Sequence, residues 1–465
     1  MIRILMGILF LLPVLAGAWN LTEKKIPDWI RFESRIRPRQ SFEILLAERL
    51  CEKTKCDGFS AAEILQKIWN GTADSLEVFR ISRSTAVEIL HLPQNRRTFR
   101  RSEFENARPL LRQYAEREDS HPLTREFIRL NSALDLYDSI QSDFLVHRAV
   151  PEESLSSEEL RKLQAEAFYL SIDPMFFIWI LSCCAFCLAA LGNRSRRAFR
   201  AGWILEVLLA FGIFTVFVWR GICEGRLPFA SLYEMVMAVA FGIAAVTGIA
   251  AFKTKMPGVL LGGAGTVFLL VTLLRLAFPA SGAFEPVSLL LNSPFWLSLH
   301  VLTIAFGFCT LIFSSVAAHI SLWLGVFRKA PSESLRSILR ATLRIGFVFS
   351  ALGTVLGGFW ADIAWGRFWG WDPKECAALL VLLWTLILLH LEHGNWISAK
   401  TWDALSAFLL VVIAFCLFGV NLLGVGLHSY GYSPSVFFAF SAFSILDSLL
   451  IGFAYFLSRK NCQIP

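Results

Sequence analysis

The feature that most limits the fold of this chain is a succession of nine apolar runs in its second part. A helix that crosses the hydrocarbon core of a bilayer needs at least about 17 mostly apolar residues, and each run reaches this length. Lipid offers the backbone no hydrogen-bond partners, so an apolar run that crosses it is expected to be helical. The runs cover about residues 174–192, 202–219, 232–252, 257–277, 295–327, 343–361, 374–393, 403–424 and 434–457. We therefore predict an all-α polytopic membrane protein with about nine transmembrane helices.

Polarity changes along the chain and divides it into three predicted parts. Residues 1–20 contain Arg3, an apolar stretch and then small residues, the layout of a secretory signal peptide or of an uncleaved signal anchor. Residues 21–172 are polar throughout, and we predict an exported soluble domain there. Residues 173–460 form the predicted membrane domain. The net charge of +7 does not indicate a nucleic-acid partner, because much of the excess lies in short loops between apolar runs.

The charge of the short loops predicts how the chain is oriented. If residues 21–172 are exported, alternate loops and the C-terminal tail lie in the cytoplasm, and these carry the cations, as the positive-inside rule requires. They contain Arg194, Arg196, Arg197, Arg200, Lys253, Lys255, Arg328, Lys329, Arg336, Arg340, Arg344, Lys400, Arg459 and Lys460. We predict a multi-pass protein of the bacterial cytoplasmic membrane, with the soluble domain on the periplasmic side and the C-terminus in the cytoplasm.

The positions of the cysteines and acids predict their environments in this membrane protein. Cys51 and Cys56 lie in the predicted exported domain, where an oxidising compartment permits a disulfide. The cysteines inside apolar runs are expected to be buried packing residues, namely Cys183, Cys184, Cys187, Cys309 and Cys416. The acids in these runs are Glu206, Glu234 and Asp447. Glu234 fits a helix start, whereas Asp447 lies deeper and has no partner that the sequence identifies.

An aromatic segment, Trp365–Glu375, lies in a loop on the predicted outer side. Glycines make its backbone adaptable, and its large aromatic residues and cations are Trp365, Phe368, Trp369, Trp371, Arg367 and Lys374. One interpretation is a platform for a large planar apolar ligand with a charged edge. The other is the belt of tryptophans that is common at membrane interfaces. Asp372 and Glu375 predict the N-cap and third residue of a capping box that starts the next helix.

Two histidines are expected on the same side of the membrane as this loop. His300 lies about a turn and a half into a helix entered from outside, and His428 lies in a loop after another helix. Neutral imidazoles are good ligands of haem iron, so the pair predicts axial ligation of one haem. His390 lies roughly 26 Å along the helix that begins at Pro373, at a depth similar to that of His319. An ionisable residue near the inner side of a membrane is a functional candidate.

These motifs resemble those of the CcsA/ResC-type cytochrome c assembly proteins, a haem-handling family whose hallmark is a tryptophan-rich loop. The resemblance covers about residues 174–457. Its most specific part is Trp365-Gly-x-x-Trp369-x-Trp371-Asp372-Pro-Lys-Glu. Three further segments support it, namely Gly225-x-x-Pro228-x-x-Ser231-Leu-Tyr-Glu234, Trp296-Leu-x-Leu-His300-Val301 and Asn421-Leu-Leu-Gly-x-Gly-Leu-His428-Ser-Tyr-Gly431.

The resemblance implies that haem b is both ligand and substrate. It would be held beside the tryptophan loop by His300 and His428, with its propionates near Arg367 and Lys374, and joined to Cys-x-x-Cys-His motifs of an exported apocytochrome c. The chain would then be a component of a holocytochrome c synthase. His390 corresponds to an intramembrane histidine that the family uses after the loop.

The resemblance also implies partners. A ResB/CcsB-like membrane subunit supplies a second intramembrane histidine in this family, and a thiol-reducing membrane protein keeps the apocytochrome thiols reduced. Here the single N-terminal apolar run contains no histidine. Residues 21–172 are therefore either the remaining end of a fused partner or an unrelated domain. The second ligand of His390 is either a histidine of the partner or His319.

Two other functions fit the same residues. A haem-binding module could relay or export haem without attaching it, and a transporter unrelated to haem could carry the tryptophans as an interface belt. Haem that co-purifies with the chain would support attachment or relay and would exclude the unrelated transporter. Formation of covalent cytochrome c in a host without its own assembly system separates attachment from relay.

Overall fold

The computed structural model describes residues 26–33, 35–53, 55–115, 121–142, 144–228, 231–277, 294–327, 329–423 and 434–460. The chain forms two compact units, which meet in sequence between Leu155 and Ser156. The change in polarity suggests a boundary at 172/173 instead. The residues between these two positions form α8 (Ser157–Ile172), and its Ala165 carbonyl accepts a hydrogen bond from Trp219 of the second unit.

The first unit is mainly helical, with three two-stranded antiparallel pairs, β1–β2, β3–β4 and β5–β6. Its elements are β1 (Trp29–Phe32), β2 (Arg35–Pro38), α2 (Arg39–Cys51), β3 (Lys55–Cys56), β4 (Phe59–Ser60), α3 (Ala61–Trp69), β5 (Phe79–Arg80), α4 (Ser84–Ile89), β6 (Thr98–Phe99), η1 (Arg101–Phe104), α5 (Arg108–Ala115), α6 (Pro122–Gln141), α7 (Phe144–Arg148) and η2 (Glu152–Ser154). The predicted disulfide between Cys51 and Cys56 is present and joins the end of α2 to β3.

In the second unit, nine helices within the described residues are long and apolar enough to cross a membrane. Besides α8 it contains α9 (Pro174–Leu191), α10 (Arg196–Glu224), α11 (Leu232–Thr254), α12 (Pro257–Ala277), α13 (Pro294–Val326), α14 (Glu333–Trp365), α15 (Pro373–His393), α16 (Ala399–Ala414), η4 (Phe415–Gly419), η5 (Val420–Leu423) and α17 (Pro434–Lys460). The prediction of an all-α polytopic membrane protein is confirmed.

Two of these helices are longer than their apolar runs predict. α10 begins at Arg196 rather than near residue 202, and α14 begins at Glu333 rather than near residue 343. Ser195 and Ser332 cap them, each accepting a hydrogen bond from a backbone N–H of the first turn. Hydropathy marks only the part of a helix that suits lipid, so it misses the polar turns that carry the loop cations.

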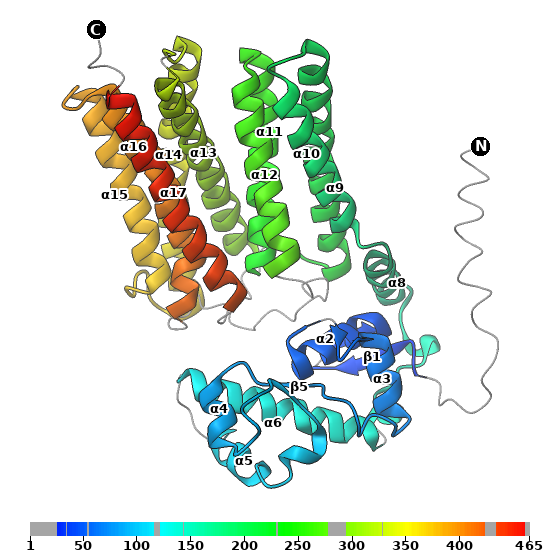
Figure 1. Ribbon diagram of the computed structural model, residues 1–465. Helices are drawn as coiled ribbons and strands as arrows, with labels where there is room; N and C mark the ends of the chain where they lie inside the picture. The colour runs from blue at the N-terminus through cyan, green and yellow to red at the C-terminus, as the bar shows by residue number, and fades with distance from the viewer. Residues whose placement is uncertain are drawn as a thin grey trace. The chain divides into compact units, whose positions relative to one another are not determined.

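The helices of the second unit pack in two groups (Figure 1). One contains α9, α10, α11 and α12, and the other contains α13 to α17, with α11 and α13 in contact between them. Small residues bring some helices close together. A Cβ atom on Gly353 of α14 would lie 2.8 Å from backbone atoms of Ile304 on α13. Close approach of backbones through small residues is typical of membrane helices.

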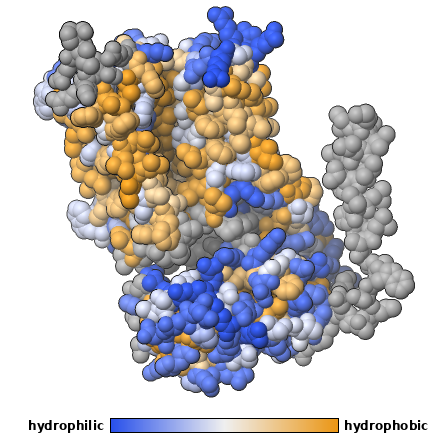
Figure 2. Space-filling model, viewed as in Figure 1, coloured by the Kyte–Doolittle hydropathy of each residue, from blue (hydrophilic) through white to orange (hydrophobic). Residues whose placement is uncertain are grey.

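The surface of the second unit is largely apolar along the length of its helices (Figure 2). Large exposed residues such as Phe211, Leu269 and Leu446 suit contact with lipid. Cys184 and Cys187 of α9 are also exposed, so the prediction that they are buried is wrong. Lipid is as apolar as a helix interface, and hydropathy therefore cannot tell the two environments apart.

Candidate functional site

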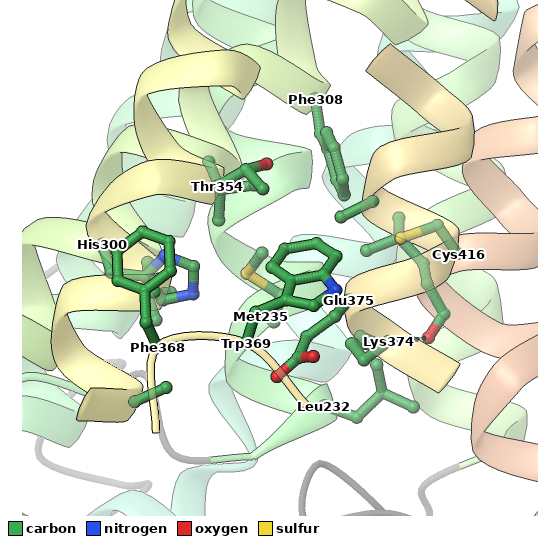
Figure 3. Close-up of a pocket in the computed structure, with 17 residues that line it drawn as sticks. Leu232, Met235, His300, Phe308, Thr354, Phe368, Trp369, Lys374, Glu375 and Cys416 are labelled. Atoms are coloured by element: carbon green, nitrogen blue, oxygen red, sulfur yellow. Dashed lines mark hydrogen bonds between the residues drawn. The ribbon is translucent and has the colours of Figure 1, made fainter. Parts of the chain in front are cut away.

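A cavity lies where α11, α13, α14, the tryptophan loop, α15 and η4 meet (Figure 3). Most of its lining is apolar or aromatic, and a few polar groups converge on it. The lining includes Leu232, Met235, His300, Phe308, Thr354, Phe368, Trp369, Lys374, Glu375 and Cys416.

His300 stands in the wall of this cavity with one ring nitrogen already bonded. Its Nδ1 lies 2.7 Å from the carbonyl oxygen of Gly353 on α14. A carbonyl only accepts, so Nδ1–H is the donor and the neutral ring carries its lone pair on Nε2. The indole of the buried Trp360 lies parallel to the imidazole, with ring centroids 6.3 Å apart. Metal-ligating histidines commonly hold one ring nitrogen in such a bond to protein, which fixes the tautomer and the orientation of the ring.

The place of the His300 ring depends on glycine at position 357. A Cβ atom on Gly357 would lie 2.6 Å from Cε1 and 2.9 Å from Nδ1 of His300. Gly357→Ala is therefore expected to displace the imidazole and to lower ligand binding in the cavity. Gly452→Ala on α17, where a Cβ atom meets nothing within 4 Å, is the matched control. Titration of each purified variant with haem tests this, and equal affinities in the two variants would contradict it.

The tryptophan loop has a defined backbone that Glu375 holds in place. Gly366 ends α14 with a φ of 69°, a left-handed conformation that glycine adopts readily. Asp372 is the N-cap of α15 and forms a capping box with Glu375, which confirms this prediction. The Glu375 carboxylate also accepts a hydrogen bond from the backbone N–H of Gly370 (2.8 Å) and pairs with Arg367 (3.4 Å).

The predicted aromatic residues of the loop occupy three different environments. Phe368 and Trp369 line the cavity, and Figure 3 places Trp369 between His300 and Lys374. Trp365 packs edge-on against Trp360, with ring centroids 4.6 Å apart. Trp371 is 71% exposed and meets the edge of Trp369 at 5.9 Å.

The two predicted cations of the loop are both engaged with protein groups. Arg367 pairs with Glu375, and its guanidinium lies 5.8 Å from the centroid of the Trp365 ring. Lys374 lines the cavity, and its Nζ donates a hydrogen bond of 3.2 Å to the carbonyl of Leu417. Leu417 belongs to η4, a π-helical turn at the end of α16. Lys374 therefore joins the start of α15 to this turn.

Sequence reasoning missed several residues of this site. Met235, Thr354 and Cys416 line the cavity, and Trp360 stacks on His300. No spacing in the sequence marks them, because they come from α11, α14 and η4 and meet only through tertiary packing. The π-helical turn that presents Cys416 carries no clear sequence signal either, although π-turns are frequent at functional sites.

The motif that ends in Glu234 forms a buried ion network next to the cavity. Arg220 donates to Glu224 (3.2 Å) and to Glu234 (3.1 Å), and its guanidinium lies 5.1 Å from the Tyr233 ring centroid. Glu234 also closes a capping box with Ser231, as expected of an acid at a helix start. Its neighbours Leu232 and Met235 line the cavity. The network therefore fixes the α11 wall of the site.

The remaining histidines lie apart from this cavity. His428 lies outside the described residues. His390 is exposed on α15, and its Nδ1–H donates to the carbonyl of Leu386 at 2.9 Å. His319 uses both ring nitrogens, since Nδ1 lies 2.8 Å from the Ser315 carbonyl and Nε2 lies 3.1 Å from Asp447. The structure thus gives Asp447 a partner that the sequence does not identify.

Comparisons with known proteins agree with these motifs. The family model for the cytochrome c assembly protein matches residues 172–428, which is more than half of the chain. The chain is 27% identical to the cytochrome c biogenesis protein CcsA of Guillardia theta over 298 residues, which are 58% of this chain and 98% of that protein. It is 30% identical to CcsA of Synechococcus sp. (strain RCC307) over 252 residues, which are 46% of this chain and 79% of that protein.

A solved structure, the cytochrome c heme lyase CcmF, also matches, with a TM-score of 0.48 and 18% identity. The match covers 66% of this chain and 52% of that one. The residues that the family model matches include α9 to α16 and the cavity at His300. This chain belongs to the cytochrome c assembly protein family, and it is a multi-pass membrane protein of the CcsA type that functions in cytochrome c biogenesis.

Proposed function

We propose that the chain binds haem in the cavity, with Nε2 of His300 as an axial ligand, and delivers it to an exported apocytochrome c. One observation carries this proposal: the imidazole of His300 stands in the cavity wall, and its Nδ1–H is bonded to the carbonyl of Gly353, so Nε2 is the nitrogen that would bind iron. Membership of a cytochrome c assembly family supports haem as the ligand, because a cytochrome c carries a covalently attached haem.

The cavity offers what a large porphyrin needs. Its lining is mostly apolar, and Trp369 and Phe368 provide flat aromatic faces. The two propionates need cations or hydrogen-bond donors, and Arg367 and Lys374 are the candidates. Each would exchange a present contact, to Glu375 or to the Leu417 carbonyl, for a propionate. The second axial ligand proposed is His428, and Trp365 and Asp372 hold the loop in place.

Loop charges support the proposed orientation, with the first unit and the tryptophan loop on the periplasmic side of a bacterial inner membrane. Haem would then be presented to the Cys-x-x-Cys-His thiols outside the cytoplasm. A ResB/CcsB-like subunit and a thiol-reducing membrane protein are the proposed partners. Haem supplies the vinyl groups to which the thiols add, and this chain would hold and orient the haem.

A separate test asks whether the chain takes part in attachment or only in relay. The full chain is expressed with and without a ResB/CcsB-like subunit in a bacterial host that lacks its own cytochrome c assembly system. Attachment predicts covalent cytochrome c in the host that carries both subunits. Haem that co-purifies with the chain while no covalent cytochrome c forms would favour relay.

The different environments of two tryptophans lead to a specific expectation. Trp369→Ala is expected to weaken haem binding about ten-fold or more, since loss of one aromatic stacking contact costs about 1–3 kcal/mol for nucleobases, which are comparable planar ligands. Trp371→Ala serves as the matched control, because Trp371 is mostly exposed. Haem titration of both purified variants provides the measurement. Normal haem binding in Trp369→Ala would leave only the interface-belt interpretation.

His390 is proposed to belong to an inner haem site that feeds the outer one. Its exposed position on α15 suits a site that a second subunit completes. His319 is a poorer second ligand because both of its nitrogens are bonded within the protein. His319→Gln, whose amide can still donate to Asp447 but does not ligate iron, is therefore expected to leave haem content unchanged. Haem that is lost in this variant, in the absence of a partner, would identify His319 as the ligand instead.

A further inference from the structure

Glu206 is a carboxyl group buried inside the membrane domain without a hydrogen bond. It lies near the middle of α10 and has no exposed surface. Neither carboxylate oxygen has a hydrogen-bond partner in the part of the chain that the structure describes. An ionised carboxylate is very costly in such surroundings, and the group becomes neutral by binding a proton instead.

The residues of α10 on either side of Glu206 contact α11. One turn before it, the indole N–H of Trp203 donates to the carbonyl of Gly248 at 2.8 Å. The next residue, Val207, lies 3.5 Å from where a Cβ atom of Gly248 would be. Glu206 is thus level with Thr247 and Gly248. The hydroxyl of Thr247 is also buried and also has no hydrogen-bond partner among the described residues.

Other buried acids of this unit are treated differently. Glu224 and Glu234 pair with Arg220, Asp403 accepts a hydrogen bond from Ser321 (2.6 Å), and the partly buried Asp447 lies against His319. These partners neutralise or solvate the acids. These acids each have a hydrogen-bond or ion-pair partner, and Glu206 differs from them in this respect.

Titratable groups on the packed helices offer Glu206 no such partner. α10 is in contact with α8, α9, α11 and α12. The cations and acids of α11 and α12 lie toward the helix ends, where Lys253 is exposed, Arg275 pairs with Asp173, and Glu234 belongs to the Arg220 network. α8 contributes the buried acid Glu166, which is not a cation that could neutralise Glu206. Within the apolar part of α9 the titratable groups are cysteines only, Cys183, Cys184 and Cys187.

We propose that Glu206 is a proton-binding site within the membrane, and that it takes up and releases a proton during cytochrome c assembly. A position that served packing alone would be filled at lower cost by an apolar side chain, and ionisable residues inside membranes commonly serve proton transfer. Proton release would leave a carboxylate that needs water or a donor, and the buried hydroxyl of Thr247 on the neighbouring helix is a candidate donor. The proposal rests on the role of the family in cytochrome c assembly, and haem binding at His300 is not needed for it.

Infrared spectroscopy of the full-length protein tests the protonation state. The spectrum of the wild-type protein at neutral pH is expected to contain a carbonyl band of a protonated carboxylic acid that Glu206→Gln lacks. The band should shift in D₂O and disappear as the pH rises. A spectrum without this band, or a band that Na⁺ abolishes at constant pH, would overturn the proposal, the latter in favour of a cation site.

Cytochrome c formation tests whether proton exchange matters. Glu206→Gln is neutral and nearly isosteric, so we expect it to fold and to unfold thermally like the wild type, yet to form covalent cytochrome c several-fold more slowly. Glu206→Asp keeps the acid and is expected to restore most of the rate. Wild-type activity in Glu206→Gln would show that the group is only structural. Haem binding by the purified chain is measured in parallel, and its absence in the wild type would contradict the proposal for His300 without affecting the infrared result.

Discussion

Replacing His300 with glycine is expected to remove most of the haem that co-purifies with the chain and to abolish cytochrome c formation. The substitution deletes the nitrogen that the cavity presents, while the glycines of α14 keep their positions. Added imidazole should enter the vacated space and restore part of both the haem content and the activity. Haem content is measured from the absorption spectrum, and activity from covalent cytochrome c in cells.

The control is the same substitution at a histidine away from the cavity. His393 is exposed at the end of α15, and His393→Gly is expected to bind haem with the wild-type spectrum. If His300→Gly keeps the wild-type haem content and spectrum, the axial role of His300 is wrong. Loss of haem that imidazole does not restore would indicate structural damage instead.

A second large effect is expected from the ion network beside the site. Arg220 is 2% exposed and bridges Glu224 and Glu234. Arg220→Met would leave two buried acids with too little positive charge, and breaking a buried pair in this way costs about 3–5 kcal/mol. We expect a much lower unfolding temperature in detergent, measured by tryptophan fluorescence, and weaker haem binding because Leu232 and Met235 shift.

An exposed pair provides the comparison for Arg220. The Arg344 side chain is 62% exposed and pairs with Glu392 at 3.2 Å. Exposed pairs contribute about 0–1 kcal/mol, so Arg344→Met should change the unfolding temperature little. Adding Glu234→Gln to Arg220→Met should recover part of the loss, since it removes one uncompensated charge. Equal unfolding temperatures for Arg220→Met and Arg344→Met would contradict the account of the network.

Local sequence signals predicted the local structure well. Nine apolar runs indicated the nine spanning helices of the described residues, and the Asp372-to-Glu375 spacing indicated the capping box that starts α15. Cys51 and Cys56 are five positions apart, and the predicted disulfide is present. Each of these features depends on residues that are close in sequence.

Features that depend on how helices meet could not be predicted. Only the packing of α14 on α13 brings Gly353 and Gly357 against His300. Depth along a helix placed His319 near the level of His390, but depth does not give direction, and His319 faces Asp447 of α17. Met235 and Cys416 also line the site only because helices that are distant in sequence pack together.

The most direct test of the central claim is a cryo-electron microscopy map of the full-length chain purified with haem. The account predicts density for the macrocycle in the cavity beside Trp369, with the iron bonded to Nε2 of His300 and the Nδ1–H contact to Gly353 retained. A map in which haem is bound elsewhere, with the cavity filled by side chains or lipid, would contradict it.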